Sequence, residues 1–180
     1  MGLILASASP RRQELLKYIT SDFKVVPSDV EEIVPDGLKA EKQPEYLARL
    51  KALDIAKKYP NDTVVGADTS VVIGNRVLGK PKDKEDARKM LCLLSGKTHK
   101  VITGCAVVKD GVCKSFSQVS KVVFYKLSAE EIEEYISSSE PYDKAGSYAV
   151  QSKGGLFVKK IKGDYFNIVG LPIGKLNKFI

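Results

Sequence analysis

Hydrophobic positions along the chain follow two periods, the alternation typical of strands and the three-to-four spacing typical of amphipathic helices. The alternating segments predict strands at residues 2–7, 23–27, 63–73, 76–78, 99–109, 113–125, 147–151 and 156–161. The helical spacing predicts helices from Pro10 to about Ile19, from about Pro44 to Tyr59, after Asp83, from Ser128 to about Ile136, and after Pro172. Strands and helices interspersed in this way favour the mixed α/β class. Because no repeat or low-complexity linker separates them, we expect a single domain over residues 1–180.

The composition is that of a soluble globular protein. Of the 180 residues, 43% are hydrophobic and 28% are charged, and nowhere do 18 apolar residues follow one another. The segment Met1–Ser7 has no basic stretch before its apolar run, so we predict no signal peptide and a cytoplasmic protein. The net charge of +7 favours anionic partners, although the lysines are scattered as on an ordinary soluble surface.

Several kinds of site are excluded by the residue inventory. His99 is the only histidine, so a zinc site with two histidines cannot form within one chain. The cysteines lack Cys-x-x-Cys spacing and are expected to be reduced. Gly96-Lys97-Thr98 resembles the end of a P-loop, but the glycine required five residues earlier is Leu91. No Gly-x-Gly-x-x-Gly fingerprint supports a dinucleotide-binding domain.

The segment Ser7-Ala8-Ser9-Pro10-Arg11-Arg12 connects a predicted strand to a predicted helix, with Ser9 as the expected N-cap. Its simplest interpretation is a well-formed helix start. However, Arg11 and Arg12 fall in the first turn, at the positive end of the helix dipole, where a cation is unfavourable. An anion would offset this cost, so the two guanidinium groups and the free backbone N–H groups together predict a phosphate site.

Asp68 interrupts the apolar strand Val64–Ile73. A carboxylate at this position is costly unless it is paired, hydrogen-bonded or bound to a metal. Strand alternation places Gly66, Asp68 and Ser70 on one face, which leaves room beside the carboxylate. A water-facing aspartate on an edge strand is the alternative, but a catalytic base or a magnesium ligand explains the sequence better.

Other polar residues are less specific by themselves. Lys80 in Gly79-Lys80-Pro81, Lys51 on the long helix, and the pair Glu31 and Glu32 are by default solvated charges. Metal ligation is the sharper alternative for the two glutamates. Gln151 is by default structural, although a carboxamide can donate and accept at once, which suits the Watson–Crick edge of a pyrimidine.

Taken together, these segments resemble the Maf family (septum-formation-inhibitor-like proteins) over essentially the whole chain. The matching landmarks are Ser7–Arg12, Gly66–Thr69, Gly79–Pro81, Leu94–Gly96, Asp143–Gly146 and Gly170–Pro172. Their order makes them far more specific together than any one alone. The resemblance implies a two-lobed α/β fold with a mixed sheet and a central cleft, akin to the inosine triphosphatases, and commonly a homodimer.

The resemblance also implies a metal-dependent nucleoside triphosphate pyrophosphatase. Asp68 matches the family's proton acceptor, and Arg11, Thr69 and Gln151 match positions that distinguish its substrate subgroups. Gln151 is similar to the subgroup that acts on dTTP and UTP, not to the one that acts on 7-methyl-GTP. Such an enzyme would remove modified or excess pyrimidine nucleotides from the nucleotide pool.

Within this resemblance, the charges predict how a triphosphate would be held. The residues expected to bind the phosphates are Ser7, Arg11, Arg12, Lys51 and Lys80. Mg²⁺, or another divalent cation such as Mn²⁺, would be held by Asp68 and Glu31. A tight metal ligand is not easily also a free general base, so these two roles of Asp68 stay alternatives.

Two other functions remain as alternatives. The first is a non-catalytic regulator that binds nucleic acid or a division protein, which the positive charge permits. No helix-turn-helix, RNA-recognition or zinc module supports it, so we expect no nucleic-acid binding, and we expect no membrane association. The second is a pyrophosphatase for purine triphosphates such as inosine triphosphate.

Overall fold

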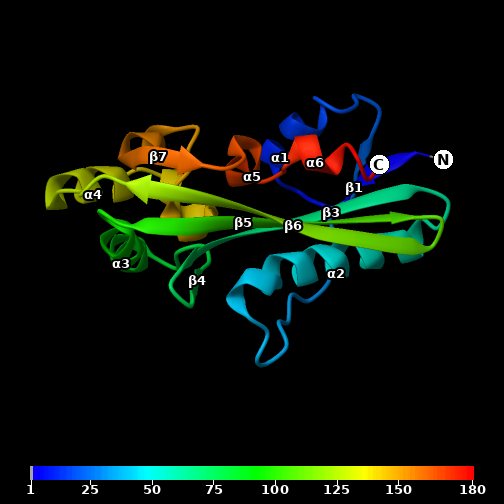
Figure 1. The fold of residues 1–180 in the computed structure, drawn as a ribbon, viewed down its shortest axis with the longest axis horizontal. Helices are drawn as coiled ribbons and strands as arrows, with labels where there is room; N and C mark the ends of the chain where they lie inside the picture. Colours follow the sequence, from blue (N-terminus) through cyan, green and yellow to red (C-terminus); the bar gives the residue numbers. More distant parts are fainter. Residues whose placement is uncertain (1) are drawn as a thin grey trace. The chain divides into compact units, whose positions relative to one another are not determined.

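A computed structural model describes residues 2–180, in which strands and helices are interspersed along the chain (Figure 1). The strands are β1 (Leu3–Leu5), β2 (Lys24–Val25), β3 (Thr63–Ile73), β4 (Arg76–Leu78), β5 (Thr98–Lys109), β6 (Val112–Phe124) and β7 (Val158–Lys162). The α-helices are α1 (Pro10–Leu16), α2 (Gln43–Lys58), α3 (Lys84–Leu94), α4 (Ala129–Ile136), α5 (Tyr165–Val169) and α6 (Ile173–Leu176). Short 3-10 turns are η1 (Ala40–Lys42), η2 (Glu140–Asp143), η3 (Ala145–Ser147) and η4 (Lys153–Phe157). Within the described residues, no helix combines the length and the apolar character that crossing a membrane requires.

The described strands form one sheet of seven, in the order β2-β1-β3-β5-β6-β7 with β4 paired to β3. β1 runs parallel to β2 and to β3, whereas β3 with β4 and β6 with β7 are antiparallel. This mixed sheet confirms the predicted α/β class. The chain divides into two compact units: unit 1 comprises Met1–Thr69, Ile102–Gln118 and Phe166–Ile180, and unit 2 comprises Ser70–Val101 and Val119–Tyr165.

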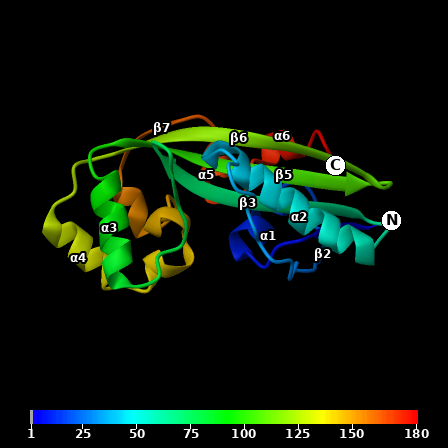
Figure 2. The same cartoon turned by 90° about the horizontal axis from the view of Figure 1, so that it is seen from below.

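In unit 1, helix α2 packs against β1, β3 and β5. Figure 2 shows the helix alongside β3. The small residues Ala48 and Ala52 of α2 are fully buried in a cluster with Ile4 and Val64. The close approach depends on Gly66 of β3, because a Cβ atom there would lie 2.3 Å from the carbonyl oxygen of Ala48. Helix α2 is therefore seated directly on β3, immediately beside the position of Asp68.

In unit 2, aromatic rings form much of the core. The ring of His99 lies edge-on to Phe124 at a centroid distance of 4.9 Å and to Tyr148 at 5.5 Å. Phe124 and Tyr148 contact each other at 4.8 Å, and all three side chains are buried. The segment that leads to Gln151 is thus attached to the unit 2 core through Tyr148.

Most predicted elements are confirmed where local chemistry defines their ends. Strands 63–73 and 76–78 have the predicted bounds. The side chain of Asp83 caps α3 by accepting a hydrogen bond from Asp86 N, and Ser128 forms a capping box at the start of α4. The helix after Pro172 is also present.

The predicted strand at 147–151 is wrong, since Ser147 ends the 3-10 turn η3 and residues 148–151 form irregular structure and a turn. Gly146 and Ser147 have φ angles of 69° and 66°, and two successive left-handed residues cannot continue a strand. Helix α5 was not predicted, because its five residues are too few to show helical spacing. Ser9 does occupy the N-cap of α1, but its side chain makes no capping hydrogen bond.

Candidate active site

The central feature of unit 1 is an ion pair between α2 and β3. Lys51 Nζ lies 2.8 Å from Asp68 Oδ1 and 3.0 Å from Glu32 Oε2. As the strand alternation predicts, Gly66 and Asp68 both face α2, where Gly66 meets Ala48 and Asp68 meets Lys51. The glycine therefore allows the helix to approach, and the residue two positions later receives its ammonium group.

The electrostatic setting makes the Asp68 carboxylate more basic than an ordinary aspartate. Burial raises the pKa of Asp68, and the neighbouring charges of Lys51 and Arg12 only partly oppose that effect. Its side chain is 14% exposed, so it is mostly but not completely buried. A carboxylate of this kind can accept a proton from an activated water molecule.

Arg12 of α1 lies on the face of β3 opposite to the Asp68 side chain. Its guanidinium group donates hydrogen bonds to four other residues of the protein. Its Nε donates to Gly170 O at 3.0 Å, and its Nη1 donates to Ala67 O at 2.8 Å and to Ser7 Oγ at 3.2 Å. Its Nη2 donates to Thr69 Oγ1 at 3.1 Å. The guanidinium group thus bonds four residues from three segments of unit 1.

Thr69 connects Arg12 to a chain of hydrogen-bonded polar side chains. Its Oγ1 lies 2.9 Å from Thr103 Oγ1 of β5. Thr103 Oγ1 donates to Asn167 O, and Asn167 Oδ1 accepts from Thr103 N at 3.1 Å. Thr103 and Asn167 are fully buried, so this chain fixes Thr69 rather than exposing new binding groups.

The other predicted site residues are more exposed. Arg11 is half-buried on α1, and the side chain of Glu31 is exposed. Glu32, its neighbour, is the glutamate that reaches Lys51 in the described structure. Lys80 and Gln151 are exposed residues of unit 2, in the loop before α3 and between η3 and η4.

A divalent cation would need oxygen donors from this site. Within residues 2–180, no cluster of three or more His, Cys, Asp or Glu side chains could hold a metal by itself. Two carboxylates, Asp68 and Glu32, do converge on the ammonium of Lys51, which shows that the site concentrates negative charge around one cation. Since Mg²⁺ is commonly held by one or two carboxylates together with substrate phosphates, the residues present fit such an ion.

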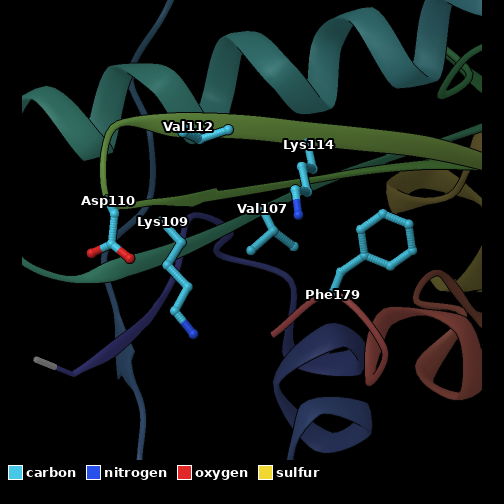
Figure 3. Close-up of a pocket in the computed structure, with 6 residues that line it drawn as sticks. All are labelled: Val107, Lys109, Asp110, Val112, Lys114 and Phe179. Carbon is cyan, nitrogen blue, oxygen red and sulfur yellow. The ribbon is translucent and has the colours of Figure 1, made fainter.

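A separate pocket of unit 1 lies near the β5–β6 turn (Figure 3). Its volume is about 240 Å³, and its lining consists of Val107, Lys109, Asp110, Val112, Lys114 and Phe179. None of the predicted site residues lines it. The chemistry of the candidate site therefore belongs to the groups around Asp68 and not to this pocket.

Comparison with known proteins places these residues in a family. The family model described as Maf-like protein matches residues 2–180. The chain belongs to the Maf family. Its similarity extends over the whole described chain, so the groups around Asp68 and those of unit 2 fall within one family match.

Curated relatives in the Maf family are highly similar. The chain is 52% identical to the dTTP/UTP pyrophosphatase of Alkaliphilus oremlandii, with 97% of this chain and 92% of that protein covered. It is 49% identical to the dTTP/UTP pyrophosphatase of Bacillus pumilus, with 96% and 92% covered. A third relative with this name, from Carboxydothermus hydrogenoformans, is also 49% identical, with 98% and 95% covered.

Solved structures support the fold. The Ham1 protein of Coxiella burnetii matches with a TM-score of 0.57 and 14% identity, covering 98% of this chain and 96% of that one. The Ham1 protein of Staphylococcus aureus matches with a TM-score of 0.54, 18% identity and the same coverage. At this identity, the likeness concerns the fold alone.

Several of the sequence segments that resemble the Maf family are joined by hydrogen bonds in this structure. Arg12 joins three of them, since its guanidinium bonds Ser7, Ala67 O and Gly170 O. In unit 2, the backbone N–H of Gly146 donates to Gly79 O at 3.0 Å and joins two more. Metal ligation was the alternative predicted for both Glu31 and Glu32, with Glu31 preferred as the ligand. No sequence pattern pointed to Thr103 or Asn167 as residues that support the site.

Proposed function

We propose that this protein hydrolyses dTTP and UTP to the nucleoside monophosphate and pyrophosphate, and so removes unwanted pyrimidine nucleotides from the pool. The names of its relatives support the reaction and the substrates. The structural observation that carries the proposal is the Lys51–Asp68 pair, a mostly buried carboxylate of raised pKa beside an ammonium group. Both a non-catalytic regulator and a purine triphosphate pyrophosphatase are less favoured by these relatives.

In the proposed reaction, Asp68 accepts a proton from the water molecule that attacks the α-phosphorus. A bond forms between the water oxygen and the α-phosphorus, and the bond to the oxygen that bridges the α- and β-phosphates breaks. Pyrophosphate leaves with the bonding electron pair. Lys51, adjacent to Asp68, stabilises the negative charge that collects on the phosphate oxygens.

The remaining cations and polar residues bind the substrate or support the site. Arg11 and Lys80 attract the phosphates, while Arg12 and Ser7 support the site, because Arg12 already bonds four protein acceptors. Thr69, fixed by Arg12 and Thr103, lies next to Asp68 in sequence and contributes its hydroxyl. Gln151 contacts the base through its carboxamide.

In the alternative to its role as general base, Asp68 would hold a divalent cation, Mg²⁺ or Mn²⁺, together with one acid of the Glu31–Glu32 pair. When bound, the cation would neutralise phosphate charge and polarise the scissile phosphoanhydride. The ion pair to Lys51 supports Glu32 as this acid, and Glu31 is the alternative that the sequence suggested. Comparing Mg²⁺ activation of Glu31→Gln and Glu32→Gln tests the choice, since the true ligand should require more Mg²⁺ for half-maximal activity.

We further propose that the protein is soluble in the cytoplasm and forms a homodimer. Its partner is a small nucleotide and neither a membrane nor nucleic acid. Light scattering of the purified protein tests the dimer. Titration of generic duplex DNA at two salt concentrations tests the nucleic-acid alternative, which predicts binding that weakens steeply with salt.

The function itself is tested by pyrophosphate release with Mg²⁺ across a panel of pyrimidine and purine triphosphates. Release should be fastest from dTTP and UTP and should fall by about 10²- to 10⁴-fold in Asp68→Asn, the range that a lost general base costs. Asp22→Asn is the matched control, because Asp22 is an exposed aspartate of the same unit. No release from any triphosphate would contradict the proposal, whereas release from purine triphosphates alone would contradict its substrate assignment.

A further inference from the structure

Glu140, at the start of η2, accepts several hydrogen bonds through one carboxylate oxygen. Its Oε1 accepts from Tyr135 Oη at 2.9 Å, from Ser152 Oγ at 2.5 Å and from Gly154 N at 3.0 Å. Tyr135 belongs to α4, whereas Ser152 and Gly154 lie 12 and 14 residues after Glu140 in the chain. The carboxylate therefore ties the segment that follows Gln151 to the core of unit 2.

The segment of residues 149–155, called here the Gln151 loop, is a tight turn. The backbone N–H of Gly155 donates to Ser152 O at 2.9 Å. A Cβ atom at Gly154 would lie 2.9 Å from both Ala149 O and Tyr135 Oη, and one at Gly155 would lie 2.5 Å from Val150 O. Only glycine permits this packing, so the loop has little room for alternative conformations.

The two ends of the Gln151 loop are fixed while its tip is exposed. Before the loop, the Tyr148 hydroxyl lies 2.7 Å from Nε2 of the buried His99. After Gln151, Ser152 and Gly154 are held by Glu140. Gln151 itself is exposed. A side chain presented in this way gains binding selectivity because its backbone is ordered before the ligand arrives.

The charge of Glu140 strengthens this attachment. The side chain is half-buried, and burial by itself would raise its pKa. Hydrogen bonds from Ser152, from the Gly154 backbone and from Tyr135 outweigh burial and hold the pKa of Glu140 below its ordinary value. The ionised form is thus the one that the loop stabilises, and bonds to an ionised acceptor are about twice as strong as neutral ones.

We propose that Glu140 is a positioning residue that fixes the Gln151 loop and thereby sets how strongly the protein discriminates between nucleotide bases. The proposal rests on the proposed function, in which Gln151 contacts the base. Glu140 does not touch the substrate in this account. It acts by holding the backbone from which the Gln151 carboxamide meets the polar edge of a pyrimidine.

A merely structural role for Glu140 makes a different prediction. Loss of a structural residue would lower the free energy of unfolding and reduce the turnover of all triphosphates alike. Loss of a positioning residue changes the ratio of kcat/KM between dTTP and a purine triphosphate such as dATP. It also acts mainly through KM, because Asp68, Lys51 and Arg11 belong to unit 1 and are left intact by the substitution.

The experiment compares three variants with the wild-type enzyme at a temperature where all are folded. Glu140→Ala removes the acceptor, Glu140→Gln keeps a carbonyl oxygen at the same position, and Glu134→Ala is the matched control on the exposed surface of α4. For each, kcat and KM are measured for dTTP, UTP and dATP. Amide hydrogen exchange of residues 149–155 is measured on the same proteins without nucleotide.

The expected result for Glu140→Ala is a fall of about 10- to 100-fold in the dTTP-to-dATP ratio of kcat/KM, the range that a misplaced binding group costs. Exchange should become faster in the Gln151 loop. Glu140→Gln should restore most of the discrimination, and Glu134→Ala should match the wild type. Unchanged discrimination in Glu140→Ala, or an equal loss for all three nucleotides, would overturn the proposal.

The two proposals fail in distinguishable ways. If the wild-type protein releases no pyrophosphate from any triphosphate, the proposed function fails. Wild-type exchange rates in the loop of Glu140→Ala would then also overturn the positioning role.

If Glu140→Ala does not fold, Ser152→Ala provides the second variant. It removes one loop bond to Glu140 and should shift the discrimination ratio in the same direction by a smaller factor.

Discussion

Lys51 Nζ and Asp68 Oδ1 lie 2.8 Å apart, although the two residues are 17 positions apart in sequence and belong to a helix and a strand. Both side chains are mostly buried, with 13% and 14% of their surfaces exposed. Charges in such a place are screened less by solvent than on an open surface. The ammonium group therefore has a direct effect on the proton affinity of the carboxylate.

Replacing Lys51 by methionine should shift the pH dependence of turnover. Lys51 opposes the effect of burial on Asp68, so its removal raises the pKa of that carboxylate further. Activity that needs ionised Asp68 then requires a higher pH, and the acidic limb of the kcat/KM profile moves upward. The measurement is a pH profile of pyrophosphate release from dTTP.

Lys57→Met is the control for this substitution, because Lys57 is an exposed lysine of the same helix. It should leave the acidic limb where it is. An unshifted limb in Lys51→Met would show that Asp68 is not the group whose ionisation governs the rate.

Gly66→Ala should reduce both stability and activity. The new Cβ atom would lie 2.3 Å from Ala48 O and 2.9 Å from Ala52, so α2 must move away from β3. Forcing an extra carbon into a packed core typically costs about 1–3 kcal/mol, and the same movement draws Lys51 away from Asp68. Urea denaturation and a dTTP assay measure the two effects.

Gly174→Ala is the matched substitution, because a Cβ at Gly174 meets nothing within 4 Å. It should leave the free energy of unfolding and the rate close to wild type. Wild-type stability in Gly66→Ala would mean that α2 can shift without cost, contrary to the close packing described for unit 1.

The parts of this protein that the sequence predicted depend on local patterns. Alternation found the strand with Asp68 and placed Gly66 on the same face, because both properties follow from the two-residue repeat. The caps at Asp83 and Ser128 were found because a side chain there bonds a backbone N–H only three residues away.

The parts that the sequence could not predict depend on distant contacts. Asn167 bonds Thr103 across 64 residues, and nothing near either residue signals the pairing. Likewise, the pairing of Glu32 and not Glu31 with Lys51 depends on the path of a segment that has no regular structure and therefore no sequence period. The strand predicted at 147–151 is absent because Ser147 has left-handed backbone, and Gly146 before it lies so close to Val71 that a Cβ atom there would come within 2.9 Å of that side chain, which alternation does not reveal.

The two neighbouring arginines should respond differently to the same substitution. Arg12→Lys keeps the charge but cannot reproduce the fork that bonds Gly170 O, Ala67 O and Thr69. We expect it to lower the free energy of unfolding by roughly 2 kcal/mol, since bonds to a charged group contribute on that scale. Arg11→Lys should cost less stability and mainly raise KM. Urea denaturation and steady-state kinetics of both variants decide the matter, and equal stability losses would contradict the supporting role of Arg12.

His99 should make the protein sensitive to acid. Burial lowers the pKa of His99 from 6.5 to about 4, because the ring lies in the aromatic core of unit 2. Between these values, the unfolded chain binds a proton that the folded chain does not, so stability falls as the pH falls. The contribution is fully present above pH 6.5 and is lost as the pH approaches 4, with a total of about 3 kcal/mol.

The comparison that isolates this effect is His99→Gln, which keeps a polar group near the Tyr148 hydroxyl but does not titrate. The difference in free energy of unfolding between wild type and variant should be constant above pH 6.5 and should shrink as the pH falls towards 4. Subtracting the variant removes the contribution of the carboxylates, which titrate in both proteins. Parallel curves for the two proteins would show that His99 becomes protonated in the folded core, and that burial does not control its charge.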